Sequence, residues 1–213
     1  MGKPIDLHSL NHIDEADDEE LRKSFLKLSD NGKNKKNLFS YGEFKDFISF
    51  SQRLMGFVSG NKARGYFINC EVGLGISQQF DILRFSEKKV VNIELKHERP
   101  KKGFPAICKQ LQKHRFLLNN LKRKVVACTF VCEENKLWLL KDEQLEEITF
   151  NYLSSLIDDD YSYENVLDKT ELSDLVISPY SEPRRFNHHC YYLSDEQVRV
   201  KEVILRNDKK NLE

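Results

Sequence analysis

Apolar side chains recur every three or four residues along several stretches of this chain, which is typical of amphipathic helices. The helices predicted in this way cover residues 19–30, 41–58, 104–121 and a last stretch from 194 to about 205. Ser40 and Glu43 have the spacing of a capping box, which indicates where the second helix begins. The pattern therefore predicts helices in several separate parts of the chain.

In other stretches, apolar residues alternate with polar ones or follow one another without interruption. These patterns predict strands at 65–72, 79–86, 89–96, 125–132 and 136–140. Only a short turn separates the second strand from the third, so these two form a hairpin. The run at 125–132 is almost continuously apolar, as in a strand buried on both faces. The order helix, three strands, helix, strand predicts an α/β fold with a mixed central sheet flanked by helices.

Composition divides the chain into an N-terminal extension (1–39), a core (40–141), an acidic helical extension (142–176), and a linker with a C-terminal helix (177–213). The first 18 residues are polar and acidic, so we expect a loosely ordered lead-in there. The acidic extension has helical tendency, and two prolines mark the linker. The candidate chemistry belongs to the core.

The 34 basic and 34 acidic residues cancel, which argues against a protein that binds nucleic acid by charge alone. An enzyme with its basic residues on one face remains compatible with this balance. Five cysteines at irregular spacing indicate reduced thiols, and no apolar stretch is long enough to span a membrane. We therefore expect a cytoplasmic protein with no membrane association.

Three charged residues converge in the predicted hairpin. Asp81 begins one strand, and Glu94 and Lys96 end the next. Residues two apart on a strand share a face, and the hairpin brings Asp81 back opposite the end of the third strand. Two carboxylates can hold Mg²⁺ or Mn²⁺, and a lysine beside them can orient a water molecule or offset negative charge. This set suits metal-assisted hydrolysis of a phosphodiester bond.

Asp81, Glu94, Leu95 and Lys96 resemble the D…(D/E)xK signature of the PD-(D/E)xK, or restriction-endonuclease-like, nuclease superfamily. The order of the predicted elements over residues 40–140 resembles the common core of that superfamily. Phe80 stands where the proline of the motif would be. The resemblance implies a DNA nuclease in which Asp81, Glu94 and the carbonyl of Leu95 bind the metal and Lys96 assists catalysis.

Some members of the superfamily add a glutamate from the first core helix, for which Glu43 is the candidate here. Others add a glutamine from the helix after the signature, for which Gln110 and Gln112 are the candidates. Many members act as dimers, so the resemblance also implies a homodimer. Phage defence and DNA repair are among the roles that such domains serve.

Two other readings of these residues stay open. Asp30, Glu43 and Lys45 repeat the spacing of the signature, and Asp81, Glu94 and Lys96 would also suit an exposed ion-pair cluster at a sheet edge. His97 follows the signature as a surface histidine, and the group His188 to Cys190 lacks a second pair of zinc ligands. The context of strands and apolar residues favours the hairpin set as the site.

A basic stretch follows the signature directly. Its candidates for contacts with phosphates are Lys101, Lys102, Lys109, Lys113 and Arg115, accompanied by His114, Lys122, Arg123 and Lys124. A solvated helix face would account for the same charges. The sequence predicts DNA as the partner without excluding RNA.

Residues 183–205 resemble the segment that precedes the phosphate-binding loop of superfamily 1-type helicases, with Gln197 matching the adenine-contacting glutamine. The phosphate loop itself is not in the sequence. The resemblance implies a helicase partner or a fused helicase domain. Besides a nuclease, the sequence therefore allows a catalytically silent nucleic-acid-binding module or a regulatory module of a helicase.

Overall fold

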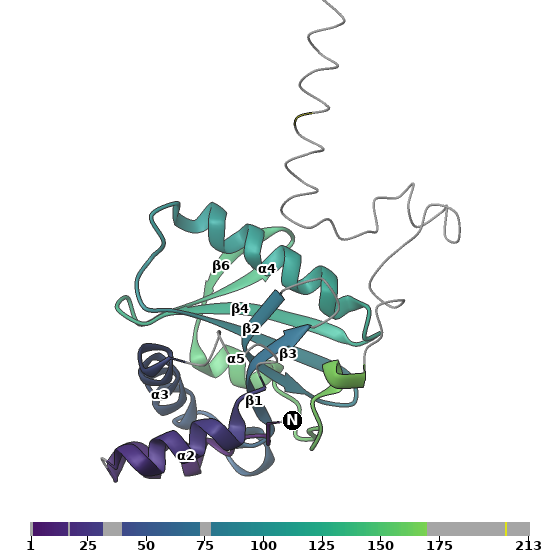
Figure 1. The fold of residues 1–213 in the computed structure, drawn as a ribbon. Coiled ribbons are helices and arrows are strands. Elements are labelled where there is room, and N and C mark those ends of the chain that lie inside the picture. The colour runs from purple at the N-terminus through teal and green to yellow at the C-terminus, as the bar shows by residue number, and fades with distance from the viewer. Residues whose placement is uncertain (1, 17, 32–39, 73–77, 170–202, 204–213) are drawn as a thin grey trace, which may run out of the picture. The chain divides into compact units, whose positions relative to one another are not determined.

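A six-stranded sheet forms the centre of the protein (Figure 1). The computed structural model describes residues 2–16, 18–31, 40–72, 78–169 and Val203. Its strands are β1 (Tyr66–Val72), β2 (Gln78–Phe85), β3 (Lys89–Lys96), β4 (Lys124–Val131), β5 (Lys136–Lys141) and β6 (Gln144–Ile148). They lie in the order β1-β2-β3-β4-β5-β6. Only β3 and β4 pair in parallel, which makes the sheet mixed and open.

Helices pack against both faces of the sheet. The described α-helices of the compact unit are α1 (Leu7–Glu15), α2 (Glu19–Ser29), α3 (Tyr41–Met55), α4 (Gly103–Asn119) and α5 (Phe150–Leu156). Two short 3-10 helices cover Gly60–Ala63 and Val166–Lys169. The helix α4 connects β3 to β4, as a parallel pair requires, and covers one face, while α3 lies on the other (Figure 1).

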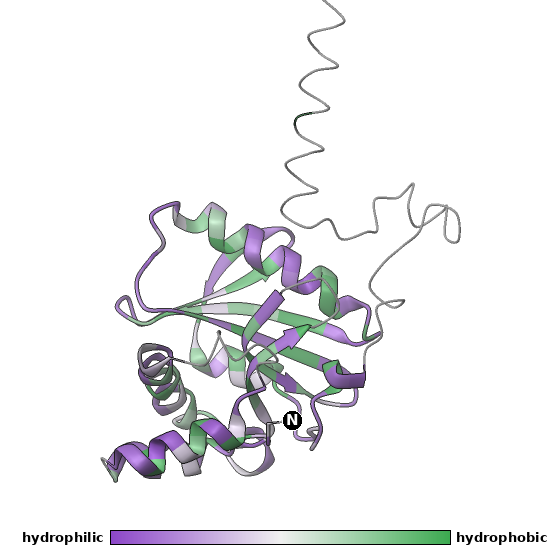
Figure 2. Ribbon diagram, in the orientation of Figure 1, coloured by the Kyte–Doolittle hydropathy of each residue, from purple (hydrophilic) through white to green (hydrophobic). Residues whose placement is uncertain are grey.

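The core follows from this layering. A large apolar cluster joins α1, α3 and α5 to the sheet, and a smaller one lies between α4 and the strands β4 and β5. The strands are accordingly rich in hydrophobic residues, whereas α2 carries many hydrophilic ones (Figure 2). None of the helices in the described ranges is both long and apolar enough to cross a membrane. The four cysteines within these ranges are free thiols.

Most elements of the predicted core are confirmed. The helix predicted at 41–58 spans Tyr41–Met55, and the one predicted at 104–121 spans Gly103–Asn119. The capping box is present, because the Ser40 hydroxyl accepts from the backbone N–H of Glu43 at 3.2 Å and the Glu43 carboxylate accepts from that of Ser40 at 2.6 Å. The predictions for residues 177–202 and 204–213, including the cap at Ser194, lie outside the described residues.

The expectation of a loosely ordered lead-in over residues 1–18 is wrong. Leu7, Leu10 and Ile13 recur on one side of α1 and are buried in the main core. The side chain of Asp6 caps this helix by accepting from the backbone N–H of His8 at 2.9 Å. Ile5 forms an antiparallel bridge with Tyr66, so the N-terminal segment covers the edge of β1.

The helical prediction for the acidic extension is wrong over Gln144–Ile148, which form the edge strand β6. Pairing with β5 stabilises this charged segment. Lys136 and Lys141 on β5 lie 2.7 and 3.1 Å from Glu147 and Glu146 on β6. Charges of opposite sign across two strands support a sheet, so the acidic residues here suit a strand as well as a helix.

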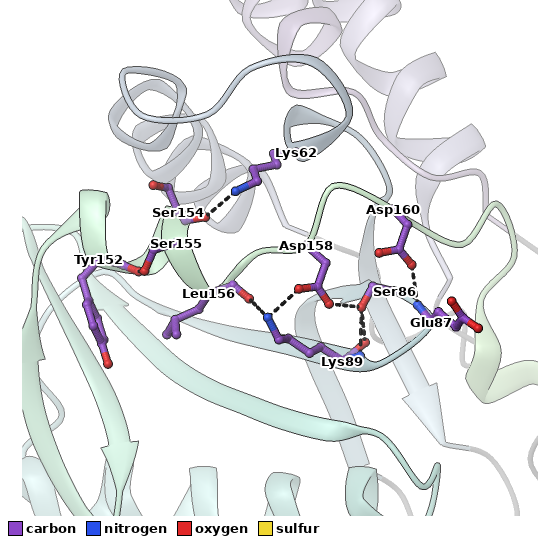
Figure 3. A network of polar contacts seen from close by, with 10 residues as sticks. All are labelled: Lys62, Ser86, Glu87, Lys89, Tyr152, Ser154, Ser155, Leu156, Asp158 and Asp160. Carbon is purple, nitrogen blue, oxygen red and sulfur yellow. Dashed lines mark hydrogen bonds and ion pairs between the residues drawn. The ribbon is translucent and has the colours of Figure 1, made fainter.

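A polar network fixes the closed end of the β2–β3 hairpin (Figure 3). Asp158 accepts from the Ser86 hydroxyl at 2.8 Å and pairs with the Lys89 ammonium at 2.5 Å. Asp160 accepts from the backbone N–H of Glu87 at 2.7 Å. Because the turn is held in this way, the hairpin presents its other end, with Asp81 and Glu94, in a defined position.

Candidate active site

Asp81, Glu94 and Lys96 meet where β2 and β3 begin to separate. The regular pairing of these strands ends at Ile82 and Ile93. At the next position, the Asp81 Oδ2 atom accepts from the backbone N–H of Leu95 at 2.8 Å, so a side chain replaces a ladder hydrogen bond. The Lys96 Nζ atom lies 3.9 Å from Glu94 Oε2. The structure thus brings the three residues of the predicted signature together.

Glu94 is the most enclosed member of the cluster, with 1% of its surface exposed. Gln110 on α4 donates its Nε2 hydrogen to Glu94 Oε2 at 2.7 Å. The His114 Nδ1 atom lies 2.9 Å from Oε1, although the two are not aligned as a regular hydrogen bond. Gln112 instead donates to Glu143 at 2.8 Å, so of the two candidate glutamines Gln110 belongs to the cluster.

The two carboxyl groups have opposite pKa shifts. Burial, together with the negative charge of Glu94, raises the pKa of Asp81 well above its ordinary range. Burial acts in the same direction on Glu94, but the neighbouring His114 and Lys96 outweigh it and lower the pKa of that carboxyl. The cluster therefore holds adjacent acidic groups whose mutual repulsion a cation would relieve.

Glu43 lies within electrostatic reach of Asp81, since its charge also raises the pKa of that carboxyl. Its own carboxylate is occupied with capping α3 through the bond to Ser40. The first core helix thus places a third acidic group within electrostatic range of Asp81, but the carboxylate of this group caps the helix.

Two features near the cluster are not predicted by the sequence. The sequence places His114 among the basic surface residues, but in the structure it is buried beside Glu94 and its ring lies 4.5 Å from that of Phe80. Asn69 on β1 stands opposite Asp81, at the one position missing from the regular β1–β2 pairing, and has a left-handed backbone with φ of 51°. The four-residue spacing from Gln110 was a usable signal for His114, because both face the sheet.

The donor set can be tested against a metal ion. Among the described residues, no group of three or more His, Cys, Asp and Glu side chains is arranged to hold a metal ion, so any ion here would have at most two side-chain ligands from such residues; this is too few for a structural zinc site. Magnesium is commonly held by one or two carboxylates and otherwise keeps its waters. The two backbone polar groups of a strand residue point to the same neighbouring strand, so the carbonyl of Leu95 is directed towards Asp81 as well. Asp81, Glu94 and Leu95 therefore fit Mg²⁺ or Mn²⁺.

The basic residues after the signature divide into two groups. Lys109 and Lys113 are four residues apart and lie on one side of α4, and Lys102 immediately precedes this helix; we call these three residues the lysine stripe. Lys101 and Lys102 are exposed just before this helix. Arg115 points to the other side, where it pairs with Glu143 at 2.5 Å. Within the basic stretch, the lysine stripe and Arg115 therefore lie on different sides of α4.

The remaining candidates do not form a second cluster. Asp30 accepts from the Asn69 amide at 2.7 Å, and Lys45 lies over the ring of Tyr41. His97 is largely exposed and its Nδ1 atom lies 3.0 Å from the Asp46 carboxylate. The residues His188 to Cys190 and Gln197 lie outside the described residues. The set with the same spacing as the signature therefore forms no site, because Asp30, Glu43 and Lys45 make separate contacts.

Comparisons of the chain with family models, curated proteins and solved structures gave no match.

Proposed function

We propose that this protein is a metal-dependent nuclease that hydrolyses phosphodiester bonds of DNA. The observation that carries this proposal is the meeting of Asp81, Glu94 and Lys96 at the open end of one hairpin, with Glu94 almost fully buried. Burying charged groups is costly, so a cluster of this kind is uncommon unless the charges have a function. The α/β architecture supports a restriction-endonuclease-like core, with the antiparallel strands β1–β3 followed by α4 and the parallel strand β4.

The chain's own residues divide the work in this proposal. Asp81, Glu94 and the Leu95 carbonyl would hold Mg²⁺ or Mn²⁺, which when bound would polarise the scissile phosphate and lower the pKa of a water molecule. The Leu95 N–H fixes the orientation of Asp81, and Gln110 fixes that of Glu94. Lys96, which is partly exposed, orients the attacking water and offsets the negative charge that develops on the phosphate.

The lysine stripe would position the substrate. Lys102, Lys109 and Lys113 lie at the beginning and along one side of α4, the helix that carries Gln110, where they would bind phosphates of the DNA backbone. Contacts to the backbone position a strand without selecting a sequence. We therefore expect cleavage with little sequence preference and with strong dependence on salt.

A catalytically silent DNA-binding module is the second candidate. The observation in its favour is the enclosure of Glu94, whose Oε2 atom already accepts from Gln110. In such a module the same charges would form a structural network that needs no cation. Metal dependence separates the two functions.

The test is cleavage of plasmid DNA and of single-stranded DNA by the purified protein, with Mg²⁺, with Mn²⁺ and with a chelator. The variants Asp81→Asn and Lys96→Ala are compared with Asp159→Asn and Lys88→Ala. Both control residues are exposed; Lys88 lies in the turn at the closed end of the hairpin, and Asp159 lies between two residues that contact this turn. We expect metal-dependent cleavage that falls at least about 100-fold in the first two variants. The two control variants should cleave like the unchanged protein.

Cleavage that persists in both site variants would show that the activity arises elsewhere or from a contaminant. DNA binding without cleavage in either metal would favour the silent module. A folded variant is required for each comparison, which thermal unfolding of the same samples verifies.

A further inference from the structure

An aromatic ring flanked by two cations lies on the surface at the beginning of α3. Tyr41 is the first residue of this helix and is 52% exposed. The Arg22 guanidinium, from α2, lies 5.0 Å from the centre of its ring, and the Lys45 ammonium lies 4.8 Å from it. Within the described ranges, Lys45 forms no ion pair with a carboxylate. Tyr41 is not part of the apolar core cluster, so its ring is accessible at the surface.

The ring lies within one helical turn of Glu43, the acidic group of α3 that acts on the candidate active site. Tyr41 and Glu43 are both in the first turn of α3, about 3 Å apart along the helix axis. Glu43 acts electrostatically on Asp81. Residues two apart project about 160° from each other around a helix, so Tyr41, which meets Arg22 of α2, and Glu43 lie on different sides of α3. Figure 1 shows α2 and α3 on the face of the sheet opposite α4.

We infer that Tyr41 is a base-stacking subsite and that the nuclease takes single-stranded or locally unpaired nucleic acid. A strand that crosses the beginning of α3 would meet Tyr41 within a few nucleotides of Asp81. An aromatic ring with adjacent cations is the typical binding element for such strands, because every base has a flat face to stack and every nucleotide has a phosphate. The bases of a duplex are already stacked on one another and do not reach the ring.

The two cations have separate roles in this subsite. A stacked base interacts with an aromatic ring more strongly than an exposed lysine does, so the incoming base displaces Lys45. The long side chain of Lys45 then reaches a phosphate beside the stacked base. Arg22 belongs to the neighbouring helix and holds the ring from its side.

The subsite rests on the proposed nuclease function, and a binding assay without cleavage tests it separately. Asp81→Asn protein in a chelator is titrated into a fluorescent oligothymidylate and into a matched duplex, and anisotropy is recorded. Adding Tyr41→Ala should weaken single-strand binding by roughly 5- to 100-fold and leave duplex binding unchanged. Tyr41→Phe should stay within about two-fold. Tyr152→Ala, which removes a 47% exposed tyrosine on α5, is the matched control and should have no effect.

A single abasic nucleotide, moved stepwise along the oligonucleotide, locates the stacked base. At one position the abasic site should weaken binding as much as Tyr41→Ala does, and the two changes together should cost no more than one alone. Equal weakening of single-strand and duplex binding by Tyr41→Ala would overturn the inference, and so would no weakening of either. A protein that stacks DNA through Tyr41 without ever cleaving it would retain the subsite and refute the nuclease.

Discussion

Removing the charge of Asp81 should stabilise the metal-free protein. Asp81→Asn keeps an oxygen that can accept from the Leu95 N–H, now 2.8 Å from Oδ2, and it removes the repulsion from Glu94. At an effective dielectric constant of about 20, two like charges repel by about 4 kcal/mol at 4 Å and about 2 kcal/mol at 8 Å. Lys96 offsets part of this repulsion. We therefore expect a gain of about 1–3 kcal/mol in the free energy of unfolding at pH 8.

The gain should depend on pH in a defined direction. The pKa of Asp81 is raised in the folded protein, so the group favours folding most below its ordinary pKa of 3.8, and this contribution is lost as the pH rises through the raised value. The Asp81→Asn variant has no carboxyl group at this position and so does not lose this contribution. The difference in the free energy of unfolding between the variant and the unchanged protein should therefore grow as the pH rises and shrink in acid.

Thermal unfolding in a chelator measures the effect, at roughly 2–4 °C for each kcal/mol in a domain of this size. Added Mg²⁺ should raise the melting temperature of the unchanged protein and have little effect on the variant, because a bound ion stabilises only the folded state that holds it. The exposed control Asp159→Asn should respond like the unchanged protein. An Asp81→Asn variant that is less stable in the chelator, or equally responsive to Mg²⁺, would refute the reasoning.

Three further predictions concern the scaffold. Gly65→Ala should cost several kcal/mol or prevent folding, because the added Cβ would lie 2.5 Å from the Tyr161 ring at a backbone φ of 84°, and urea unfolding measures the loss. Arg84→Met should lower the free energy of unfolding by about 3 kcal/mol in the same assay, because two backbone carbonyls that now accept from Arg84 at 2.8 and 3.1 Å would lose their donor. An unchanged free energy of unfolding would mean that water replaces the guanidinium as the donor. Asp158→Asn should cost about 1 kcal/mol at pH 7. Burial tends to raise the pKa of Asp158, but hydrogen bonds from Lys89 and Ser86 lower it, so this difference should disappear as the pH falls from 3.8 through the lowered value.

The apolar spacing was sufficient to predict the elements that carry the candidate site. It located α3 and α4 and five of the six strands, because their buried residues repeat with the period of the element. The hairpin geometry then predicted that Asp81 and Glu94 would meet. The helical phase of α4 also distinguishes the two candidate glutamines. Gln110 and Gln112 point to different sides of the helix, and only Gln110 shares the side of the buried Ile107.

The parts that escaped prediction depend on contacts between distant residues. Because α1 and β6 are rich in acidic residues, their sequences do not indicate the structures that they form. The helix α1 buries three apolar side chains in the core, and the strand β6 is paired with lysines of the neighbouring strand. The burial of His114 results from the packing of α4 over Glu94, which no local pattern encodes. The left-handed backbone of Asn69 is likewise not predictable from the sequence, because the residues around it favour a strand.

The bridge between Ile5 and Tyr66 has a consequence for biosynthesis. The residues around Ile5 leave the ribosome well before Tyr66 does, so this segment must wait for its strand partner. During that interval Leu7, Leu10 and Ile13 have no core to enter. The newly made segment around α1 is therefore exposed to chaperones and proteases until β1 emerges, and slower translation between α1 and β1 would lengthen that exposure.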